Sequence, residues 1–269
     1  MVKKLMKYDF SAFGKTILPM EIILLGIAVL TRFLQFFEND SKIYNILNVS
    51  SIVLLIVAMI VCIVMTVAIC VVRFYKNLYT QEGYLTLSLP ATHAQHIISK
   101  LVTSVFATFI SLISVILAGL IATLGDLSHE IILAFNYLVK LFFNMFKIHG
   151  AFFVLEAVIA AVVVIATDYL LLFACITIGQ TAKKNRILAS FGAFFAYYVI
   201  TQIIGTVIIV IFNEFYDFIP FDAISRWIEN HQYTFAHSFA AFFIVFNAAL
   251  GLLYFAITKH IMKKKLNLE

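Results

Sequence analysis

Six long apolar runs divide this chain, and they constrain its fold more than any other feature. The runs are residues 17–37, 52–72, 101–124, 151–178, 187–212 and 239–257. Each is close to or above the roughly 20 residues that an α-helix needs to cross a bilayer. Lipid offers no hydrogen-bond partner to backbone N–H and C=O groups, so such runs must be helical. The sequence predicts an all-α integral membrane protein, with six transmembrane helices in one domain spanning residues 1–269.

The composition excludes a water-soluble globule. Hydrophobic residues make up 63% of the chain and charged residues only 12%, whereas a soluble domain is about half apolar and about a quarter charged. Too few polar side chains are present to cover a soluble surface. The three cysteines Cys62, Cys70 and Cys175 all lie in apolar runs, and they are predicted to be buried free thiols.

The basic residues indicate the orientation of the spans. They concentrate before the first run, between the second and third, between the fourth and fifth, and after the sixth: Lys3, Lys4, Lys7, Lys15, Arg73, Lys76, Lys100, Lys183, Lys184, Arg186, Lys259, Lys263, Lys264 and Lys265. The alternate loops hold only Lys42, Lys140, Lys147 and Arg226, together with most of the acidic residues. By the positive-inside rule, both termini are predicted to be cytoplasmic.

Two segments outside the runs carry amphipathic patterns. Residues 1–16 mix large apolar side chains with lysines, which predicts a helix on the cytoplasmic membrane surface; the alternative is a frayed basic tail. In the long outer loop 126–149, polar residues fall on one helical stripe and apolar residues fill the other faces. This pattern favours an amphipathic helix at the outer surface, and the alternative is a seventh, partly inserted segment.

The loop of residues 73–100 is the longest mixed polar segment between two apolar runs. Pro90 disfavours helix at the preceding residue, so the chain should break there and restart at His93 as the first turns of the third span. Before the break, residues 74–81 are predicted to form a short helix at the membrane face. A short helix held between two spans is suited to contact a partner protein.

This loop resembles the membrane subunits of ATP-binding-cassette transporters in the type-2 exporter permease family. The matching positions are Glu82, Gly83, Leu85, Leu89, Pro90 and Lys100. A second similarity is the run from Ile178-Gly179-Gln180 to Lys183-Lys184-Asn185-Arg186 at the end of the fourth span. The long outer loop between the third and fourth spans departs from the family pattern.

The resemblance implies a function as well as a fold. It implies an exporter subunit in a bacterial cytoplasmic membrane, with an N-terminal surface helix and a coupling helix between the second and third spans. The ATPase, with its ATP and Mg²⁺, would be a separate polypeptide that contacts the 73–100 loop, and a second permease chain, identical or related, would complete the transporter. The residues implied in coupling are Lys76, Glu82, Gly83, Leu89, Pro90 and Lys100.

Four ionisable residues lie within the apolar runs: Glu21, Arg32, Glu156 and Asp168. Each costs about 2.5–3.5 kcal/mol or more when exposed to lipid, so each should face protein or water. Arg32 and Glu156 lie at matching depths and are predicted to pair. Asp168 lies nearest the middle of the membrane. It could hydrogen-bond to a neighbouring helix through Thr201 or Gln202, or it could line a cargo or proton path.

Other functions have less support in the sequence. Gly14-Lys15-Thr16 resembles the end of a phosphate-binding loop, but its first glycine is replaced by Asp9 and no strand precedes it. The scattered histidines, His237 among them, show no metal or catalytic spacing. The chain is predicted to be neither an enzyme nor a nucleic-acid-binding protein, and to hold no cofactor or metal.

Two alternatives to the exporter subunit are a proton-coupled transporter that uses Glu21 or Asp168, and a non-transporting membrane anchor. The apolar spans suit an amphiphilic or peptide-like cargo.

Overall fold

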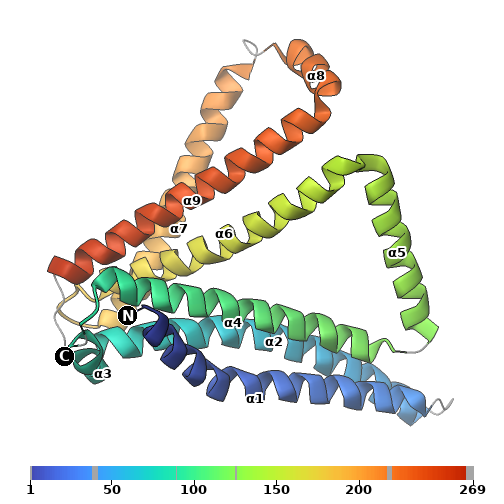
Figure 1. Cartoon of the computed structure of the whole chain (residues 1–269), viewed down its shortest axis with the longest axis horizontal. Helices are drawn as coiled ribbons and strands as arrows, with labels where there is room; N and C mark the ends of the chain where they lie inside the picture. The colour runs from blue at the N-terminus through green and yellow to red at the C-terminus, as the bar shows by residue number, and fades with distance from the viewer. Residues whose placement is uncertain (1, 38–41, 89, 125, 217–219, 265–269) are drawn as a thin grey trace. The chain divides into compact units, whose positions relative to one another are not determined.

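Six helices of the structure are long and apolar enough to cross a membrane, as predicted. The computed structural model describes residues 2–37, 42–88, 90–124, 126–216 and 220–264, and no β-strand occurs in these ranges. The six long helices are α1 (Val2–Phe36), α2 (Lys42–Tyr79), α4 (His93–Ala122), α6 (Ile148–Gly179), α7 (Arg186–Glu214) and α9 (Gln232–Lys264) (Figure 1). Each contains most of one predicted apolar run, and most extend beyond it.

Three shorter helices complete the described part of the chain: α3 (Gln81–Leu87), α5 (Asp126–Phe146) and α8 (Phe221–Asn230). The helix expected in the long loop between the third and fourth spans is therefore present as α5. The polar stripe predicted for this helix consists of Asn136, Lys140, Asn144 and Lys147. Lys147 falls just beyond α5 and has a positive φ of 48°. The helix α8 begins directly after Pro220, a residue that is tolerated where a helix starts because its missing N–H would have no partner there.

The N-terminal segment is helical and continuous with the first span, instead of forming a separate element. Its buried side chains recur every fourth residue at Asp9, Phe13 and Ile17, so one face of the helix packs against protein. Figure 1 shows that α1 bends in its N-terminal half, and Pro19 lies inside the helix. A proline ring clashes with the carbonyl four residues earlier, which bends a helix.

The contacts within the chain define two compact units. Unit 1 comprises Met1–Leu78 and Leu85–Lys147, and unit 2 comprises Tyr79–Tyr84 and Ile148–Glu269. The short stretch Tyr79–Tyr84 thus belongs to unit 2, although the chain on both sides of it belongs to unit 1. The sequence alone predicts a single domain and contains no signal for this division.

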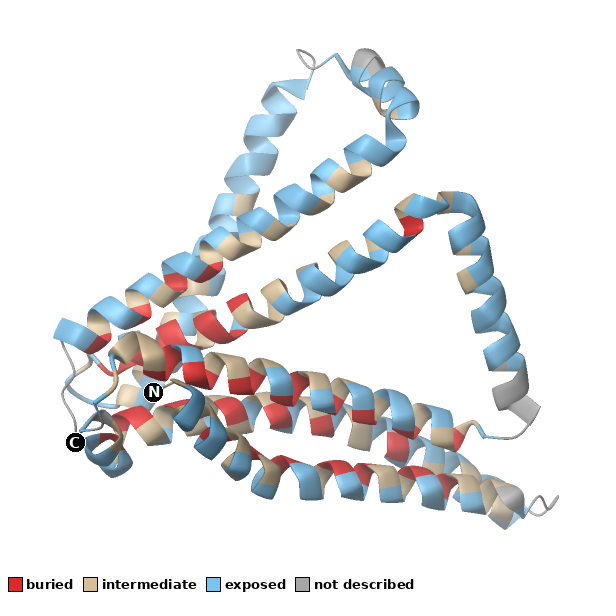
Figure 2. Ribbon diagram, viewed as in Figure 1, coloured by how far each residue is buried: buried red, intermediate tan, exposed pale blue. Residues whose placement is uncertain are grey.

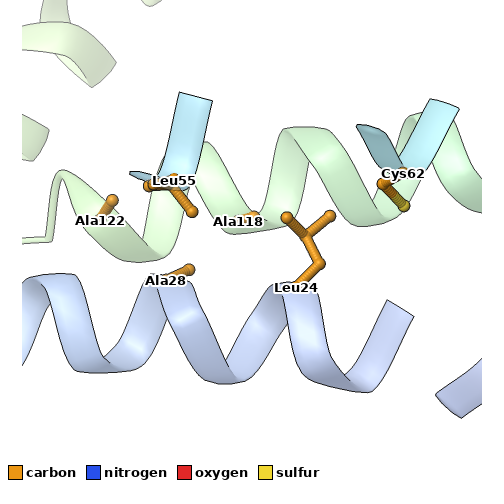
Figure 3. Close-up of a cluster of buried hydrophobic side chains, with 6 residues drawn as sticks. All are labelled: Leu24, Ala28, Leu55, Cys62, Ala118 and Ala122. Carbon is orange, nitrogen blue, oxygen red and sulfur yellow. The ribbon is translucent and has the colours of Figure 1, made fainter. Parts of the chain in front are cut away.

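In unit 1, α1 packs closely along α4 because α4 presents small side chains at the contact. These buried residues are Ser104, Ala107, Ser111, Ser114, Ala118 and Ala122. Small residues let two helix backbones approach closely within a membrane. Leu24 and Ala28 of α1 meet this stripe, and Leu55 and Cys62 of α2 complete the cluster (Figure 3).

In unit 2, α6 packs against both α9 and α7. At Gly251 of α9, an added Cβ would lie 2.9 Å from Oγ1 of Thr167, and the same hydroxyl donates to the carbonyl of Asn247 at 3.0 Å. Gly179, the last residue of α6, lies directly against Ser190 of α7. No residue of α7 is buried, and most of its ribbon is pale blue in Figure 2. Its apolar surface is therefore available to lipid or to another protein.

Candidate coupling segment and intramembrane polar groups

The chain between α2 and α4 differs in one respect from the sequence prediction. The short helix covers Gln81–Leu87, so its predicted position at residues 74–81 was wrong. Residues 73–79 contain neither glycine nor proline, and α2 continues through them without interruption to Tyr79. The separation between α2 and α3 falls at Thr80, whose carbonyl accepts a hydrogen bond of 2.7 Å from the N–H of Gly83.

The restart of the helix at His93 is confirmed, and a capping box explains it. The side chain of Thr92 accepts a hydrogen bond from the N–H of Gln95 at 3.3 Å, and the side chain of Gln95 accepts one from the N–H of Thr92 at 3.1 Å. This reciprocal pair satisfies two donors that a helix N-terminus otherwise leaves unpaired. The Thr-x-x-Gln spacing was visible in the sequence as a start signal.

The residues implied in coupling lie in different environments. Lys76 is exposed in the last turn of α2, Glu82 is exposed in α3, and Pro90 is exposed before α4. Gly83 is buried. Leu89 lies outside the described residues. Glu82 is accompanied on α3 by two exposed apolar side chains, Tyr84 at 55% and Leu85 at 76%.

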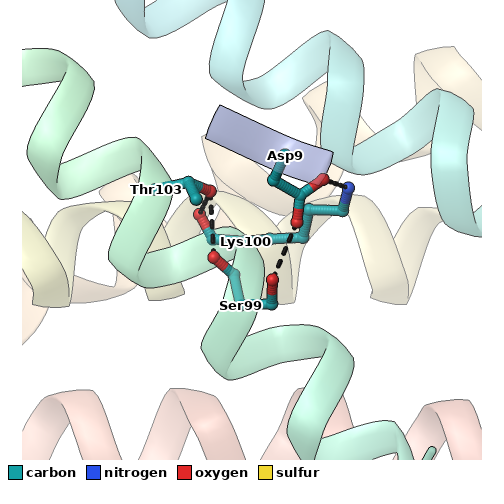
Figure 4. A network of polar contacts seen from close by, with 4 residues as sticks. All are labelled: Asp9, Ser99, Lys100 and Thr103. Carbon is teal, nitrogen blue, oxygen red and sulfur yellow. Dashed lines mark hydrogen bonds and ion pairs between the residues drawn. The ribbon is translucent and has the colours of Figure 1, made fainter. Parts of the chain in front are cut away.

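Lys100, in contrast, is buried in unit 1. Its ammonium forms an ion pair with the carboxylate of Asp9 in α1, and the hydroxyl of Ser99 donates to the other Asp9 oxygen at 2.8 Å (Figure 4). Thr103 donates to the carbonyls of Ser99 and Lys100 at 2.9 and 3.0 Å. Asp9 had no assigned role in the sequence analysis, because nothing in the sequence relates it to a lysine 91 positions later. Lys100 fixes α4 against α1.

Aromatic contacts hold the same end of α1. The guanidinium carbon of Arg73 lies 4.6 Å from the ring centroid of Phe13, a distance typical of a cation–π contact. The rings of Phe10 and Phe106 meet edge to face at 5.5 Å. The N-terminal part of α1 is therefore bound to both α2 and α4, which excludes a frayed tail.

The segment Tyr79–Tyr84 is anchored to α6 within unit 2. The hydroxyl of Tyr79 lies 2.7 Å from that of Thr177, and both residues are buried. Thr177 donates its own hydrogen to the carbonyl of Phe173 at 2.7 Å. Because a hydroxyl has a single hydrogen to donate, Tyr79 is the donor to Thr177. The last residue of α2, two positions before α3 begins, thus has a direct polar link to the C-terminal end of α6.

Glu21 is buried among three helices of unit 1, with an exposed fraction of 3%. One of its carboxylate oxygens accepts from Ser111 at 2.5 Å and the other accepts from the thiol of Cys62 at 3.2 Å. Thr66 lies 2.6 Å from the Ser111 hydroxyl. The position of Glu21 against protein was predicted, whereas these partners were not. All three cysteines are free and buried, as predicted.

Arg32 and Glu156, which the sequence predicts to pair, each have a partner within their own unit. Arg32 donates to Gln35, one turn further along α1, at 3.4 Å. In unit 2, Glu156 and Nδ1 of His237 lie 2.8 Å apart, and Nε2 of His237 lies 3.1 Å from Nδ1 of His149. Because a carboxylate only accepts, His237 donates to Glu156. This contact was not predicted from the sequence, where the histidines were taken to be solvated or interfacial.

Asp168 is exposed on α6. The structure does not show the alternative of a hydrogen bond through Thr201 or Gln202: both residues are exposed, and Thr201 donates to the carbonyl of Tyr198 in its own helix at 2.8 Å. Within the described ranges, Asp168 forms neither a hydrogen bond nor an ion pair. Within the described part of unit 2, this carboxylate therefore has no hydrogen-bond or ion-pair partner.

These features define a multi-pass, all-helical membrane protein with a short helix between its second and third spans. No family model matches the chain, and neither curated proteins nor solved structures give a match. Among the residues with described positions, no group of three or more His, Cys, Asp or Glu side chains is arranged to hold a metal ion.

Proposed function

We propose that this chain is the membrane subunit of an ATP-binding-cassette exporter, driven by an ATPase on a separate polypeptide. The observation that carries the proposal is the placement of α3. It is a separate short helix between two long apolar helices, and it exposes Glu82, Tyr84 and Leu85. An acid beside two exposed apolar side chains is suited to recognition by a partner protein.

The connections of α3 support a role in transmitting force. Its first residues belong to unit 2, and Tyr79, two positions before α3, is anchored there by its hydrogen bond to Thr177. Its last residues belong to unit 1 and lead through the capped start of α4 to the Asp9–Lys100 ion pair. A displacement imposed on α3 would therefore act on both units. Lys76, exposed in the last turn of α2, would lie within reach of the same partner.

The ATP and Mg²⁺ would be bound by the partner. The only phosphate-loop-like tripeptide of this chain, Gly14-Lys15-Thr16, lies inside α1, whereas phosphate is bound by a loop whose N–H groups are free. Closure of two ATPase subunits would move the coupling segments of two permease chains, so a second copy or a related permease is part of the proposal. Both termini, α3 and the ATPase would lie on the cytoplasmic side of a bacterial cytoplasmic membrane, with α5 on the outer side.

The buried position of Glu21 does not favour the alternative of a proton-coupled transporter. Both of its carboxylate oxygens are engaged, by Ser111 and by Cys62. A carboxylate held in this way joins α1, α2 and α4, as polar groups commonly do between membrane helices.

Co-purification tests the proposal against the anchor and the proton-driven transporter. The tagged chain is extracted in mild detergent from its native membrane, and the co-purifying proteins are identified. We expect a nucleotide-binding ATPase to co-purify with the wild type in stoichiometric amount. The amount recovered with Glu82→Lys should be at least about fivefold lower, because a reversed charge at an interface costs about 1–2 kcal/mol or more. Glu214, also an exposed acid, lies at the end of α7; Glu214→Lys is the matched control and should retain the ATPase. A chain that purifies alone under all detergent conditions would refute the motor-driven function.

A further inference from the structure

Two histidines of unit 2 lie against each other, one at the start of α6 and one in the second turn of α9. Nδ1 of His149 and Nε2 of His237 are 3.1 Å apart. Both residues are partly exposed, so water and small ions can reach them. They are 88 positions apart in the chain, and a search for closely spaced ligands in the sequence could not relate them.

Glu156 determines which nitrogen of His237 carries the proton. Its carboxylate accepts a hydrogen bond of 2.8 Å from Nδ1 of His237, and a neutral imidazole carries its proton on one nitrogen only. Nε2 of His237 therefore presents a lone pair to His149. A histidine that binds a metal ion commonly donates its other N–H to a carboxylate in this way. Glu156 and His237 thus have the arrangement of a metal ligand and its supporting acid.

Two aromatic rings hold the imidazoles in place. His149 stacks on Tyr233, with ring centroids 4.4 Å apart and planes inclined by 5°. His237 stacks on Phe153, with centroids 4.3 Å apart and planes inclined by 19°. On each helix the histidine and the aromatic residue are one turn apart, so their side chains lie on the same face. Little side-chain freedom would be lost when an ion binds, which favours affinity.

We propose that His149 and His237 bind a divalent transition-metal ion, Zn²⁺ or Cu²⁺, in an open site that water completes. Imidazole nitrogens suit these ions, whereas Mg²⁺ and Ca²⁺ prefer oxygen ligands. Two nitrogens bound to a tetrahedral Zn²⁺ at about 2.0–2.1 Å are about 3.3–3.4 Å apart, close to the 3.1 Å of the structure. The ion would replace the proton between the two rings, and that proton would move to Nε2 of His149.

This site goes beyond the proposed function and does not depend on it. It has two protein ligands, which agrees with the finding that the described residues contain no metal-binding group of three or more. The remaining coordination positions are left to water, as in other open sites. Because its ligands come from α6 and α9, the ion would join these two helices and stabilise unit 2.

Equilibrium binding of Zn²⁺ tests the site directly. The full chain carries a purification tag without histidine, is treated with a chelator in detergent, and is then titrated with Zn²⁺ in the absence of nucleotide. We expect saturable binding of Zn²⁺ and a higher melting temperature, since an ion that binds only the folded state stabilises it. Mg²⁺ at the same concentrations should have neither effect.

Three variants assign the ion to these side chains. Glu156→Gln keeps both imidazoles but removes the charge that orients His237, and it should bind Zn²⁺ about tenfold more weakly. His149→Phe keeps a ring that can stack on Tyr233 but removes a ligand, so it should lose at least as much affinity. His231→Gln removes an exposed histidine of the same unit and should bind Zn²⁺ as the wild type does.

Chemical protection of the wild type gives a second measurement that no misfolded variant can affect. Zn²⁺ should protect His149 and His237 from modification by diethylpyrocarbonate, and it should leave His231 reactive. Equal modification of His149 and His237 with and without Zn²⁺ would overturn the inference. No saturable binding to the wild type, or wild-type affinity in a folded His149→Phe, would overturn it as well and would leave the two histidines joined by a shared proton alone.

Discussion

Replacement of Gly179 by alanine is expected to destabilise unit 2 by about 3 kcal/mol or more, at the upper end of overpacking substitutions. An added Cβ would collide with the hydroxyl of Ser190 and would lie 2.5 Å from its backbone nitrogen and 2.6 Å from its Cα. A side-chain rotation cannot relieve contacts with backbone atoms. The ends of α6 and α7 would have to separate, although the turn between them is short and Asn185 there already has a positive φ of 52°.

Thermal unfolding of the purified protein in detergent measures this effect. Gly192→Ala and Gly205→Ala are matched controls within α7, because nothing lies within 4 Å of a Cβ added at either position. Each should be neutral or slightly stabilising, since alanine favours a helix by about 1 kcal/mol over glycine. Ser190→Gly should not rescue Gly179→Ala, because it leaves the backbone contacts in place. Wild-type stability of Gly179→Ala would show that α6 and α7 do not approach as described.

Removal of the Asp9 carboxylate is the second substitution with a large expected effect. Asp9→Ala leaves the ammonium of Lys100 buried without its counter-ion, which typically costs about 3–5 kcal/mol. Both residues are nearly inaccessible, with exposed fractions of 7% and 5%. The melting temperature in detergent should therefore fall well below that of Lys7→Ala, which removes an exposed charge from the same helix.

A double substitution distinguishes the ion pair from general packing. Asp9→Ala combined with Lys100→Met removes both charges, so no buried charge remains unpaired, and the double variant should be more stable than Asp9→Ala alone. If the two single effects simply add, Asp9 and Lys100 do not interact, and the contact between α1 and α4 at this end must depend on other residues.

The sequence was sufficient for features set by one stretch of chain at a time. The number of long apolar helices, the restart at His93 and the helix in the 126–149 loop each follow from local hydropathy or from a single breaker such as Pro90. The position of α3 was predicted seven residues too early, because no breaker marks the end of α2 and the helix continues to Tyr79.

The partners of the buried polar groups could not be predicted in the same way. Asp9 and Lys100 are 91 positions apart, and Tyr79 and Thr177 are 98 apart. Hydropathy locates a charge within or beside a span but does not specify which helices pack together. The small residues of α4 did carry part of this information, because a stripe of Ser, Ala and Thr indicates the face where another helix can approach.

Site-specific photocrosslinking from α3 tests the central claim most directly. A photoreactive amino acid replaces Glu82 in the tagged chain, and illuminated cells are examined for covalent adducts. A matched probe replaces Tyr137, an exposed residue of α5. The proposed function predicts an adduct with a nucleotide-hydrolysing subunit from position 82 and none from position 137. No ATPase adduct at position 82, or an equal one at position 137, would contradict a coupling role for α3.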